Sequence, residues 1–228
     1  VGKRKMNMLQ LLRTKDNSFT LFNPDLNETY HSRHGALQES QYVFIKQGLH
    51  YCAKEKQNSP LNILEVGFGT GLNALLTYLE FEKQPLPIKY YSLEPFPIPG
   101  ELINQLGYTE LLQLNEKQEK IFYGLHSGKV NDSSFNFNLI QYGLMDFNSD
   151  ANFDLVYFDA FAPEKQPDLW TKAAFDKCYS LLNSQGVLVT YCAKGEVKRT
   201  LKASGFKVET LPGPPGKREM IRAIKEPH

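Results

Sequence analysis

One stretch decides the fold, and it reads Leu61-Asn62-Ile63-Leu64-Glu65-Val66-Gly67-Phe68-Gly69-Thr70-Gly71-Leu72-Asn73. Its first six residues form an apolar run, which is typical of a buried parallel strand. Three glycines then occupy every second position, and leucines recur after them at helical spacing, at positions 72, 75, 76 and 79. Strand, glycine turn and helix in this order predict the start of a nucleotide-binding βαβ unit.

The spacing of the glycines indicates which ligand the turn binds. The order is G-x-G-x-G, so the third glycine comes one residue earlier than in the dinucleotide-binding form G-x-G-x-x-G. Glu65 stands two residues before the first glycine, at the carboxyl end of the predicted strand. A carboxylate there repels a diphosphate but suits a ligand with a positive centre. S-adenosylmethionine is such a ligand, and the alternative is a glycine-rich turn that binds nothing.

Two further carboxylates are expected at the same edge of the sheet. Glu94 ends a predicted strand and follows Gly71 by 23 residues, which is the placement of an acid that binds ribose hydroxyls. Asp159 ends another predicted strand, and ligands of open α/β sheets lie beyond the carboxyl ends of strands. A carboxylate at that place can hold an amine and direct its lone pair toward a methyl group. The alternative for Asp159 is a helix cap or a buried ion pair.

The length and the order of elements predict a single α/β domain with a mostly parallel, doubly wound sheet. We expect residues 1–58 to form an N-terminal extension with a hairpin (9–13 and 19–22) and a helix (38–51), and residues 59–228 to form the core. The remaining strands are expected over 61–66, 88–94, 135–142, 153–159, 186–192, 206–211 and 220–224. Helices are expected after the glycine turn and over 101–114, 168–182 and 197–203, with residues 118–134 irregular apart from a small hairpin.

The composition of the chain limits the location, the metals and the cofactors that we expect for this protein. The three cysteines form no C-x-x-C pair, which favours a reducing, cytoplasmic location and argues against structural zinc. His31 and His34 lack a further metal-binding partner, so we expect no metal. The sequence has one glycine-rich nucleotide motif, so we expect no flavin. It has no apolar run of about 18 residues, so we expect no membrane span. Both ends of the chain are basic, which suits a phosphate backbone or an ordinary solvated surface.

Several side chains are candidates for contact with a nucleic acid. Phe161 and Trp170 could stack on a base, as could Phe96 and Tyr191, although a place in a helix core explains Trp170 equally well. Lys217-Arg218 follow a loop rich in proline and glycine. That loop could hold both cations toward phosphates, or it could simply begin a basic strand.

Four groups of residues together resemble one known family. They are 64–73, Asp159-Ala160-Phe161-Ala162-Pro163 with 167–170, 216–220, and an N-terminal segment with Tyr30-His31-Ser32, Gly35 and Glu39. In this order they resemble the methyltransferase domain of the bifunctional tRNA 5-methylaminomethyl-2-thiouridine biosynthesis protein. The resemblance implies a Rossmann-like class I fold and S-adenosylmethionine-dependent methylation of 5-aminomethyluridine at the wobble position of tRNA. It also implies that Asp159 binds the acceptor.

The resemblance further implies a set of donor-binding residues: Glu65, Gly67, Phe68, Gly69, Gly71, Asn73, Glu94, Pro95, Asp146 and Asp159. The family's fused oxidase half is missing from this sequence, so we expect a stand-alone methyltransferase that works with a separate upstream tRNA-modifying enzyme. Where the family often has Gly-Asp, this chain has Tyr142-Gly143-Leu144-Met145-Asp146. The acid that contacts adenine is therefore Asp146, a shifted residue, or absent.

Two other functions are compatible with these patterns. An aminopropyltransferase, or another small-amine methyltransferase, shares the sheet, the glycine turn and an Asp after the fourth strand. A non-catalytic RNA-binding subunit could also retain the fold. Preference for a decarboxylated donor distinguishes an aminopropyltransferase, and failure to bind any donor distinguishes the non-catalytic RNA-binding subunit.

Overall fold

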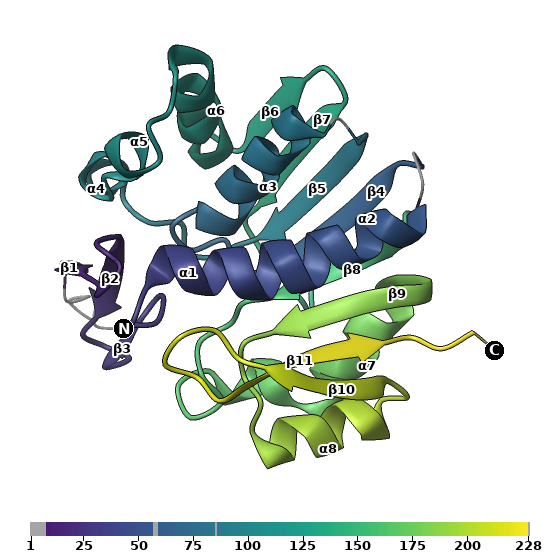
Figure 1. Cartoon of the computed structure of the whole chain (residues 1–228). Helices are drawn as coiled ribbons and strands as arrows, with labels where there is room; N and C mark the ends of the chain where they lie inside the picture. The colour runs from purple at the N-terminus through teal and green to yellow at the C-terminus, as the bar shows by residue number, and fades with distance from the viewer. Residues whose placement is uncertain (1–7, 57–58, 85, 228) are drawn as a thin grey trace.

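The computed structural model describes residues 8–56, 59–84 and 86–227, so the basic residues at positions 3–5 lie outside the described part. Its centre is an eight-stranded sheet in the order β10-β11-β9-β8-β4-β5-β7-β6 (Figure 1). The strands in chain order are β4 (Leu61–Val66), β5 (Ile88–Leu93), β6 (Lys129–Asp132), β7 (Phe135–Ile140), β8 (Phe153–Phe158), β9 (Leu182–Thr190), β10 (Lys207–Pro212) and β11 (Glu219–Ile224).

The five central strands are parallel. β4 pairs with β5 on one side and β8 on the other, while β7 and β9 extend the parallel part outward. Antiparallel strands close both edges, β6 beside β7 and the β10–β11 hairpin beside β9. The carboxyl ends of β4, β5 and β8 therefore meet at one edge, as the doubly wound prediction requires.

Helices cover both faces of this sheet (Figure 1). α3 (Leu72–Lys83) and α6 (Glu116–His126) contribute to one buried cluster, and α7 (Lys172–Leu181) and α8 (Gly195–Ala203) to the other. Side chains of β4 alternate between the two, with Ile63 in the first and Leu64 in the second. Successive side chains of a strand point to opposite faces, so the apolar run of β4 reflects burial on both sides.

The N-terminal segment forms a small sheet and a long helix. β1 (Gln10–Arg13) pairs with β2 (Phe19–Asn23), as predicted, and the two-residue strand β3 (Glu28–Thr29) adds to β2. A helix follows in three parts: α1 (Ala36–Ser40), a π-helical stretch η1 (Gln41–Leu49), and α2 (His50–Lys56). Its central part packs on α3, β8 and β9, so it forms part of the same core.

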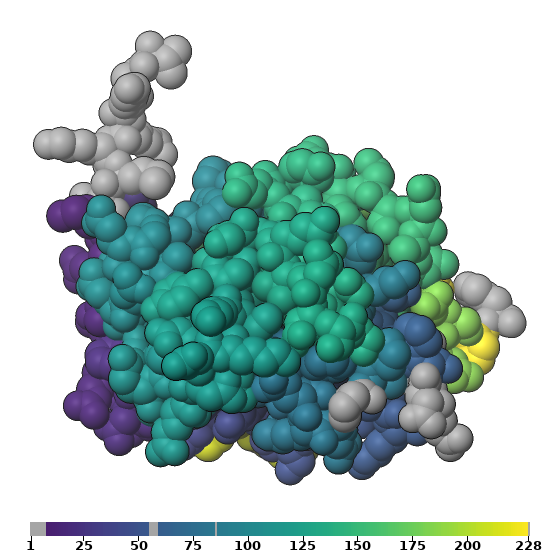
Figure 2. All heavy atoms as spheres, turned by 90° about the horizontal axis from the view of Figure 1, so that it is seen from above, coloured from purple at the N-terminus to yellow at the C-terminus, as the bar shows by residue number. Residues whose placement is uncertain are grey.

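The segment between β5 and β7 differs from its prediction. Residues 118–134 were expected to be irregular apart from a small hairpin, but their first half belongs to α6 (Glu116–His126), whose N-terminus has a capping box between Asn115 and Gln118. The helix expected over 101–114 is two short helices, α4 (Gly100–Gln105) and α5 (Tyr108–Leu111), separated by Gly107 at φ 64°. Figure 2 shows this part of the chain covering the face of the molecule that is seen from above.

The helix expected over 168–182 also differs in detail. It begins as the 3-10 turn η2 (Pro167–Trp170) and continues as α7 after Thr171, whose hydroxyl accepts a hydrogen bond from the backbone N–H of Ala174. β9 then begins at Leu182, four residues earlier than expected.

Candidate active site

The glycine turn brings the ends of three strands into contact. Gly67 N–H donates to the Leu93 carbonyl at 3.0 Å, and Asp159 N–H donates to the Val66 carbonyl at 2.9 Å. Gly67 has φ 93°, and a Cβ on it would lie 2.5 Å from the Asp159 carbonyl oxygen. Only glycine allows both this conformation and this close approach. The turn after β4 and the residue after β8 therefore form one site.

Two carboxylates of this site share one amide group. Asn73 Nδ2, on the first turn of α3, donates to Asp159 Oδ2 at 2.8 Å and to Glu65 Oε1 at 3.1 Å. Ser92 Oγ donates to the other Glu65 oxygen at 2.6 Å. Glu65 is 0% exposed, whereas Asp159 is partly exposed. Of these two acidic side chains, Asp159 is therefore the one that is accessible from outside, whereas Glu65 is fully buried.

Burial changes the acidity of both carboxyl groups. Loss of hydration raises the pKa of Glu65 to about 8, against hydrogen bonds from Ser92 and Asn73 that favour its charged form. Loss of hydration also raises the pKa of Asp159 to about 7, helped by the nearby negative charge of Glu39. The hydrogen bond from Asn73 and the positive charge of Lys217 act in the opposite direction. Asp159 can therefore change its charge near neutral pH.

Glu94 lies at the glycine turn as predicted from its spacing. Its Oε2 accepts from Gly69 N–H at 3.0 Å and its Oε1 from Phe96 N–H at 3.0 Å. Burial raises the pKa of Glu94, while hydrogen bonds from backbone N–H groups hold it down. The carboxylate at the end of β5 is thus fixed relative to the turn that follows β4.

The N-terminal segment packs over the glycine turn, which the sequence alone did not predict. A Cβ on Gly69 would lie 3.0 Å from the ring of Tyr30, and that ring meets Phe161 edge-on at 4.9 Å between centroids. Next to it His31 is buried, its ring 3.2 Å from Thr20 Oγ1 and 3.5 Å from Thr70 Oγ1. Burial lowers the pKa of His31 to about 4, so it is neutral at pH 7.

Two aromatic side chains donate hydrogen bonds to backbone carbonyls of the loop after β8. Tyr191 Oη donates to the Ala160 carbonyl at 2.9 Å, and Trp170 Nε1 donates to the Phe161 carbonyl at 2.7 Å. Trp170 is buried against Phe158 and Phe175, so it has the core position that was the alternative to base stacking. Phe161 itself stays partly exposed.

The other residues expected at the site differ in their surroundings. Phe68 is buried against His126 and Phe137, so only its backbone can face a ligand. Pro95 and Asp146 are both exposed, and within the described part of the chain no side-chain hydrogen bond or ion pair joins Asp146 to the glycine turn.

Lys217 and Arg218, which follow the proline-glycine loop, differ in their surroundings. Arg218 is exposed, as a phosphate contact would be. Lys217 instead forms an ion pair with the buried Glu39, so the structure does not place it as a free cation of the surface. The sequence left open whether these two cations contact phosphates or begin a basic strand, and charge alone does not reveal a buried partner that is distant in the chain.

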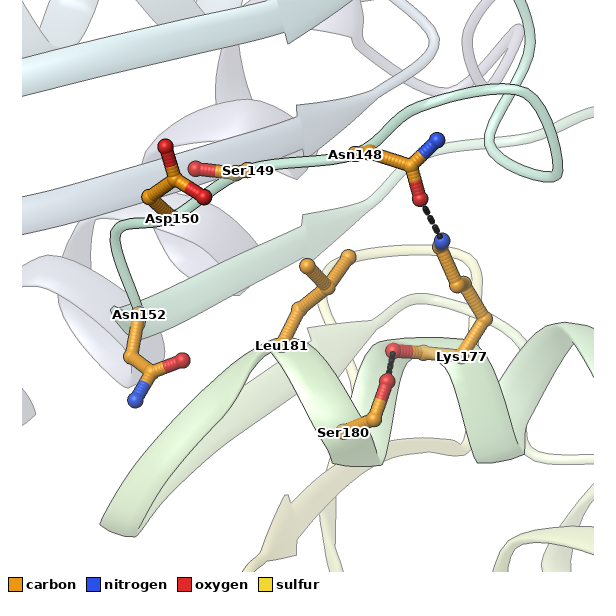
Figure 3. A pocket seen from close by; sticks show the side chains of 7 residues that line it. All are labelled: Asn148, Ser149, Asp150, Asn152, Lys177, Ser180 and Leu181. Carbon is orange, nitrogen blue, oxygen red and sulfur yellow. Dashed lines mark hydrogen bonds between the residues drawn. The ribbon is translucent and has the colours of Figure 1, made fainter.

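A polar hollow elsewhere on the molecule is separate from this site. Figure 3 shows it between the 148–152 loop and α7, where Lys177 Nζ donates to Asn148 Oδ1 at 3.0 Å. Asn152 lines it and directly precedes β8, whereas Asp159 directly follows β8. A strand of this length separates the two places by roughly 20 Å.

The described residues offer neither a metal site nor a helix that could span a membrane. Within them no group of three or more His, Cys, Asp or Glu side chains is arranged to hold a metal ion. The helices in that part of the chain are too short or too polar to cross a bilayer. The three cysteines are buried and unbridged.

The fold and the glycine turn agree with comparisons with known proteins. The model of a family described as S-adenosyl-L-methionine-dependent methyltransferase matches residues 111–226. The chain belongs to this family, so it is an S-adenosylmethionine-dependent methyltransferase of the Rossmann-like class. Over 99% of its length it is similar to the crystal structure of MNMC2 from Aquifex aeolicus, with 26% identity, a TM-score of 0.79, and 73% of that chain covered.

Two more known proteins are similar to this chain. A tRNA 5-methylaminomethyl-2-thiouridine biosynthesis bifunctional protein MnmC from Leptospira interrogans is 31% identical over 91% of this chain. The chain spans 34% of the length of that relative. Spermidine synthase from Thermotoga maritima covers 98% of the chain and is itself covered over 82%, at 14% identity and a TM-score of 0.52, which shows a shared fold alone.

Proposed function

We propose that this chain methylates the primary amine of 5-aminomethyluridine at the wobble position of tRNA, giving 5-methylaminomethyl(-2-thio)uridine. The observation that carries the proposal is the partly exposed Asp159 carboxylate, held by Asn73 beside the glycine turn. Proteins named for the biosynthesis of this nucleoside in tRNA are similar to this chain over about nine tenths of its length, which supports the choice of substrate.

The donor site is proposed at the turn that joins β4 to α3. Glycine is required at 67 and 69 by the close packing of this turn, because a Cβ would lie 2.5 Å from the Asp159 carbonyl oxygen at Gly67 and 3.0 Å from the Tyr30 ring at Gly69. Backbone N–H groups at the start of α3 and the Glu94 carboxylate then bind the donor, Glu94 through the ribose hydroxyls. When bound, S-adenosylmethionine supplies a methyl group attached to a positively charged sulfur.

Asp159 is proposed to bind and orient the acceptor amine. A primary alkylamine has a pKa of about 10, like that of lysine, so most of it arrives as an ammonium ion. The carboxylate binds this cation and keeps a hydrogen bond to the nitrogen after one proton has left, which directs the lone pair toward the methyl group. Its negative charge also stabilises the ammonium that forms again on transfer.

The tRNA is proposed to approach over the exposed edge of the same site. Phe161 is partly exposed next to Asp159 and offers a face for the target base or a neighbour, and Arg218 offers an exposed cation for a phosphate. A separate upstream enzyme must install the aminomethyl group before this reaction. We expect both enzymes to act in the cytoplasm, on the anticodon region of tRNA.

The test is incubation of the purified chain with labelled S-adenosylmethionine and tRNA from a strain that lacks this methylation. Digestion and mass spectrometry of the nucleosides should show label in 5-methylaminomethyluridine or its 2-thio form. Label in another nucleoside would contradict the assigned acceptor. Reaction only with the decarboxylated donor would indicate an aminopropyltransferase, and failure to bind either donor would indicate a non-catalytic RNA-binding protein.

A further inference from the structure

Lys217 lies inside a small charged assembly that joins three distant parts of the chain. Its Nζ forms an ion pair with Glu39 Oε2, from α1, and lies 3.7 Å from the centroid of the Tyr191 ring, just after β9. The side chains of Lys217 and Glu39 are 27% and 6% exposed. A cation that is partly desolvated over a tyrosine face interacts more strongly than one at the surface. The Lys217 ammonium therefore interacts with the side chains of Glu39 and Tyr191.

The backbone around Lys217 supports this inward position. Gly216, just before it, has φ 87°, and a Cβ there would collide with the ring of His34. The loop thus packs closely on the N-terminal segment. Glu39 is fixed as well, because its Oε1 accepts a hydrogen bond from Ser32 N–H at 3.2 Å.

Tyr191 connects this assembly to Asp159. One face of its ring meets Lys217, and its hydroxyl donates to the carbonyl of Ala160, the residue after Asp159, at 2.9 Å. On the other side of Asp159, its backbone N–H is bonded to Val66. The peptide that carries Asp159 is thus held by β4 on one side and by Tyr191 on the other.

We propose that Lys217, held by Glu39 against Tyr191, is a positioning residue for Asp159 and not a contact to tRNA phosphate. It acts through Tyr191 on the peptide that carries the acceptor-binding carboxylate. The inference deepens the proposed function and rests on it where Asp159 is concerned. In this inference three residues that lie far apart in the sequence act together to position Asp159: Glu39, Lys217 and Tyr191.

The charges of the assembly act on the same carboxylate. Glu39 raises the pKa of Asp159, and Lys217 lowers it. The ion pair therefore keeps a charge of each sign near Asp159, and the effect of Glu39 on the pKa of Asp159 is larger than that of Lys217. Removal of one partner alone leaves the other charge uncompensated, and a test must remove both in one variant.

The first test compares Lys217→Met with Lys217→Arg in single-turnover methylation at saturating donor and saturating aminomethyluridine tRNA. Misplacement of a reacting group by about 1 Å can cost about a hundredfold in rate, so we expect Lys217→Met to lose at least about tenfold. Lys217→Arg keeps a cation on the tyrosine face and should recover most of the rate. Donor affinity, tRNA affinity and the dependence of tRNA affinity on salt should stay within about twofold of wild type.

The matched control is Lys198→Met. Lys198 also lies in a partly buried ion pair, with Glu219, and its side chain is 25% exposed, yet among the described residues it forms no hydrogen bond or cation–ring contact with Tyr191. We expect its single-turnover rate to equal that of wild type. A Lys217→Met variant that keeps the wild-type rate at saturation but binds tRNA more weakly, with a smaller salt dependence, would establish a phosphate contact and overturn the inference.

Two further variants separate positioning from stability. Glu39→Gln with Lys217→Met removes both charges, so no unpaired charge remains buried, and it should fold while staying slow. Recovery of the wild-type rate in this double variant would show that Lys217 only neutralises Glu39. Tyr191→Phe keeps the ring over which Lys217 lies but removes the hydroxyl, and it should also be slow. A wild-type rate for Tyr191→Phe would remove the link to Asp159.

A last measurement does not depend on the substrate. Hydrogen exchange of the peptide over residues 159–166 should be faster in Lys217→Met and Tyr191→Phe than in wild type and in Lys198→Met. If wild type does not methylate the aminomethyluridine tRNA, the proposed function is wrong, and exchange alone decides the inference. Unchanged exchange in both variants would contradict it.

Discussion

Asn73 Nδ2 lies 2.8 Å from Asp159 Oδ2, and the same nitrogen lies 3.1 Å from Glu65 Oε1. One amide group of α3 therefore joins a carboxylate that follows β8 to one at the end of β4. An amide nitrogen carries two hydrogens, so it can donate to both oxygens at once. The G-x-G-x-G turn, where we propose that the donor binds, thus also positions Asp159, because it starts the helix that carries Asn73.

We predict that Asn73→Leu lowers the single-turnover rate by roughly ten- to a hundredfold. A hydrogen bond to a charged group contributes roughly 1.5–3 kcal/mol, and leucine of similar size cannot donate one. Rapid-quench methylation assays at saturating substrates measure the loss. Asn62→Ala is the control, because Asn62 bonds the Asn152 carbonyl at the opposite end of β4. Equal rates for Asn73→Leu and wild type would remove Asn73 from the orientation of Asp159.

We predict that Gly67→Ala destabilises the protein by about 1–3 kcal/mol or more. Alanine is strained at φ 93°, and its Cβ would lie 2.5 Å from the Asp159 carbonyl, so backbone must move. Urea unfolding measures the change in free energy of unfolding. Gly100→Ala is the matched control, because a Cβ at Gly100 meets nothing within 4 Å. If the two variants were equally stable, the close contact between the glycine turn and Asp159 would be wrong.

We predict that Glu94→Gln and Glu94→Ala weaken the binding of S-adenosylmethionine, the latter by about an order of magnitude. A hydrogen bond from a ribose hydroxyl to a carboxylate is worth roughly 1.5–3 kcal/mol, and glutamine keeps only one neutral acceptor. Because Glu94 also accepts from Gly69 N–H, thermal unfolding must show that the turn persists. Titration calorimetry measures the affinity. Unchanged affinity in both variants would contradict the ribose assignment.

The pH dependence of stability should reveal the buried Glu65. Its pKa is raised to about 8 by burial, whereas the unfolded chain has the ordinary value near 4.5, so the folded state binds the extra proton between these values. Its stabilising contribution is therefore present below about pH 4.5 and is lost as the pH rises toward 8. Glu65→Gln cannot ionise and escapes this loss.

Urea unfolding of wild type and Glu65→Gln at pH 5, 7 and 9 tests this prediction. The stability of Glu65→Gln relative to wild type should increase with pH. The comparison cancels the opposite slope of His31, whose lowered pKa makes wild type and variant alike less stable as the pH falls below about 6.5. A stability difference that does not change with pH would show that Glu65 is ionised in the folded protein.

Local patterns in the sequence predicted the parts of the fold with strong periodicity. The apolar run before Gly67 and the leucines after Gly71 predicted β4 and α3, and Glu94 was placed at the turn by its distance along the chain. α6 was missed because it is a polar helix that buries only Phe122 and Leu125, so its apolar stripe is weak. Its capping box, Asn115 with Gln118, was the signal that could have found it.

The contacts that complete the site are not local. Glu39 and Lys217 are separated by most of the chain, and neither lies in a pattern that indicates the other. Tyr30 packs over Gly69 because the N-terminal segment folds back on the core, which no periodicity predicts. Pairing between distant charges decides whether a lysine faces solvent or a carboxylate. The sequence could therefore propose Asp159 and name Asn73 and Tyr191 as site residues, but it could not show that they hold Asp159 and its loop, nor that Lys217 pairs with Glu39.

The most direct test of the account is single-turnover methylation of aminomethyluridine tRNA by Asp159→Asn, with donor affinity measured in parallel by calorimetry. Asparagine keeps the shape of the side chain but removes the charge that binds the substrate ammonium. We predict a loss of roughly 10²–10⁴ in rate, with donor affinity within about twofold of wild type. A near wild-type rate, or a loss explained entirely by failure to bind the donor, would contradict the role of Asp159.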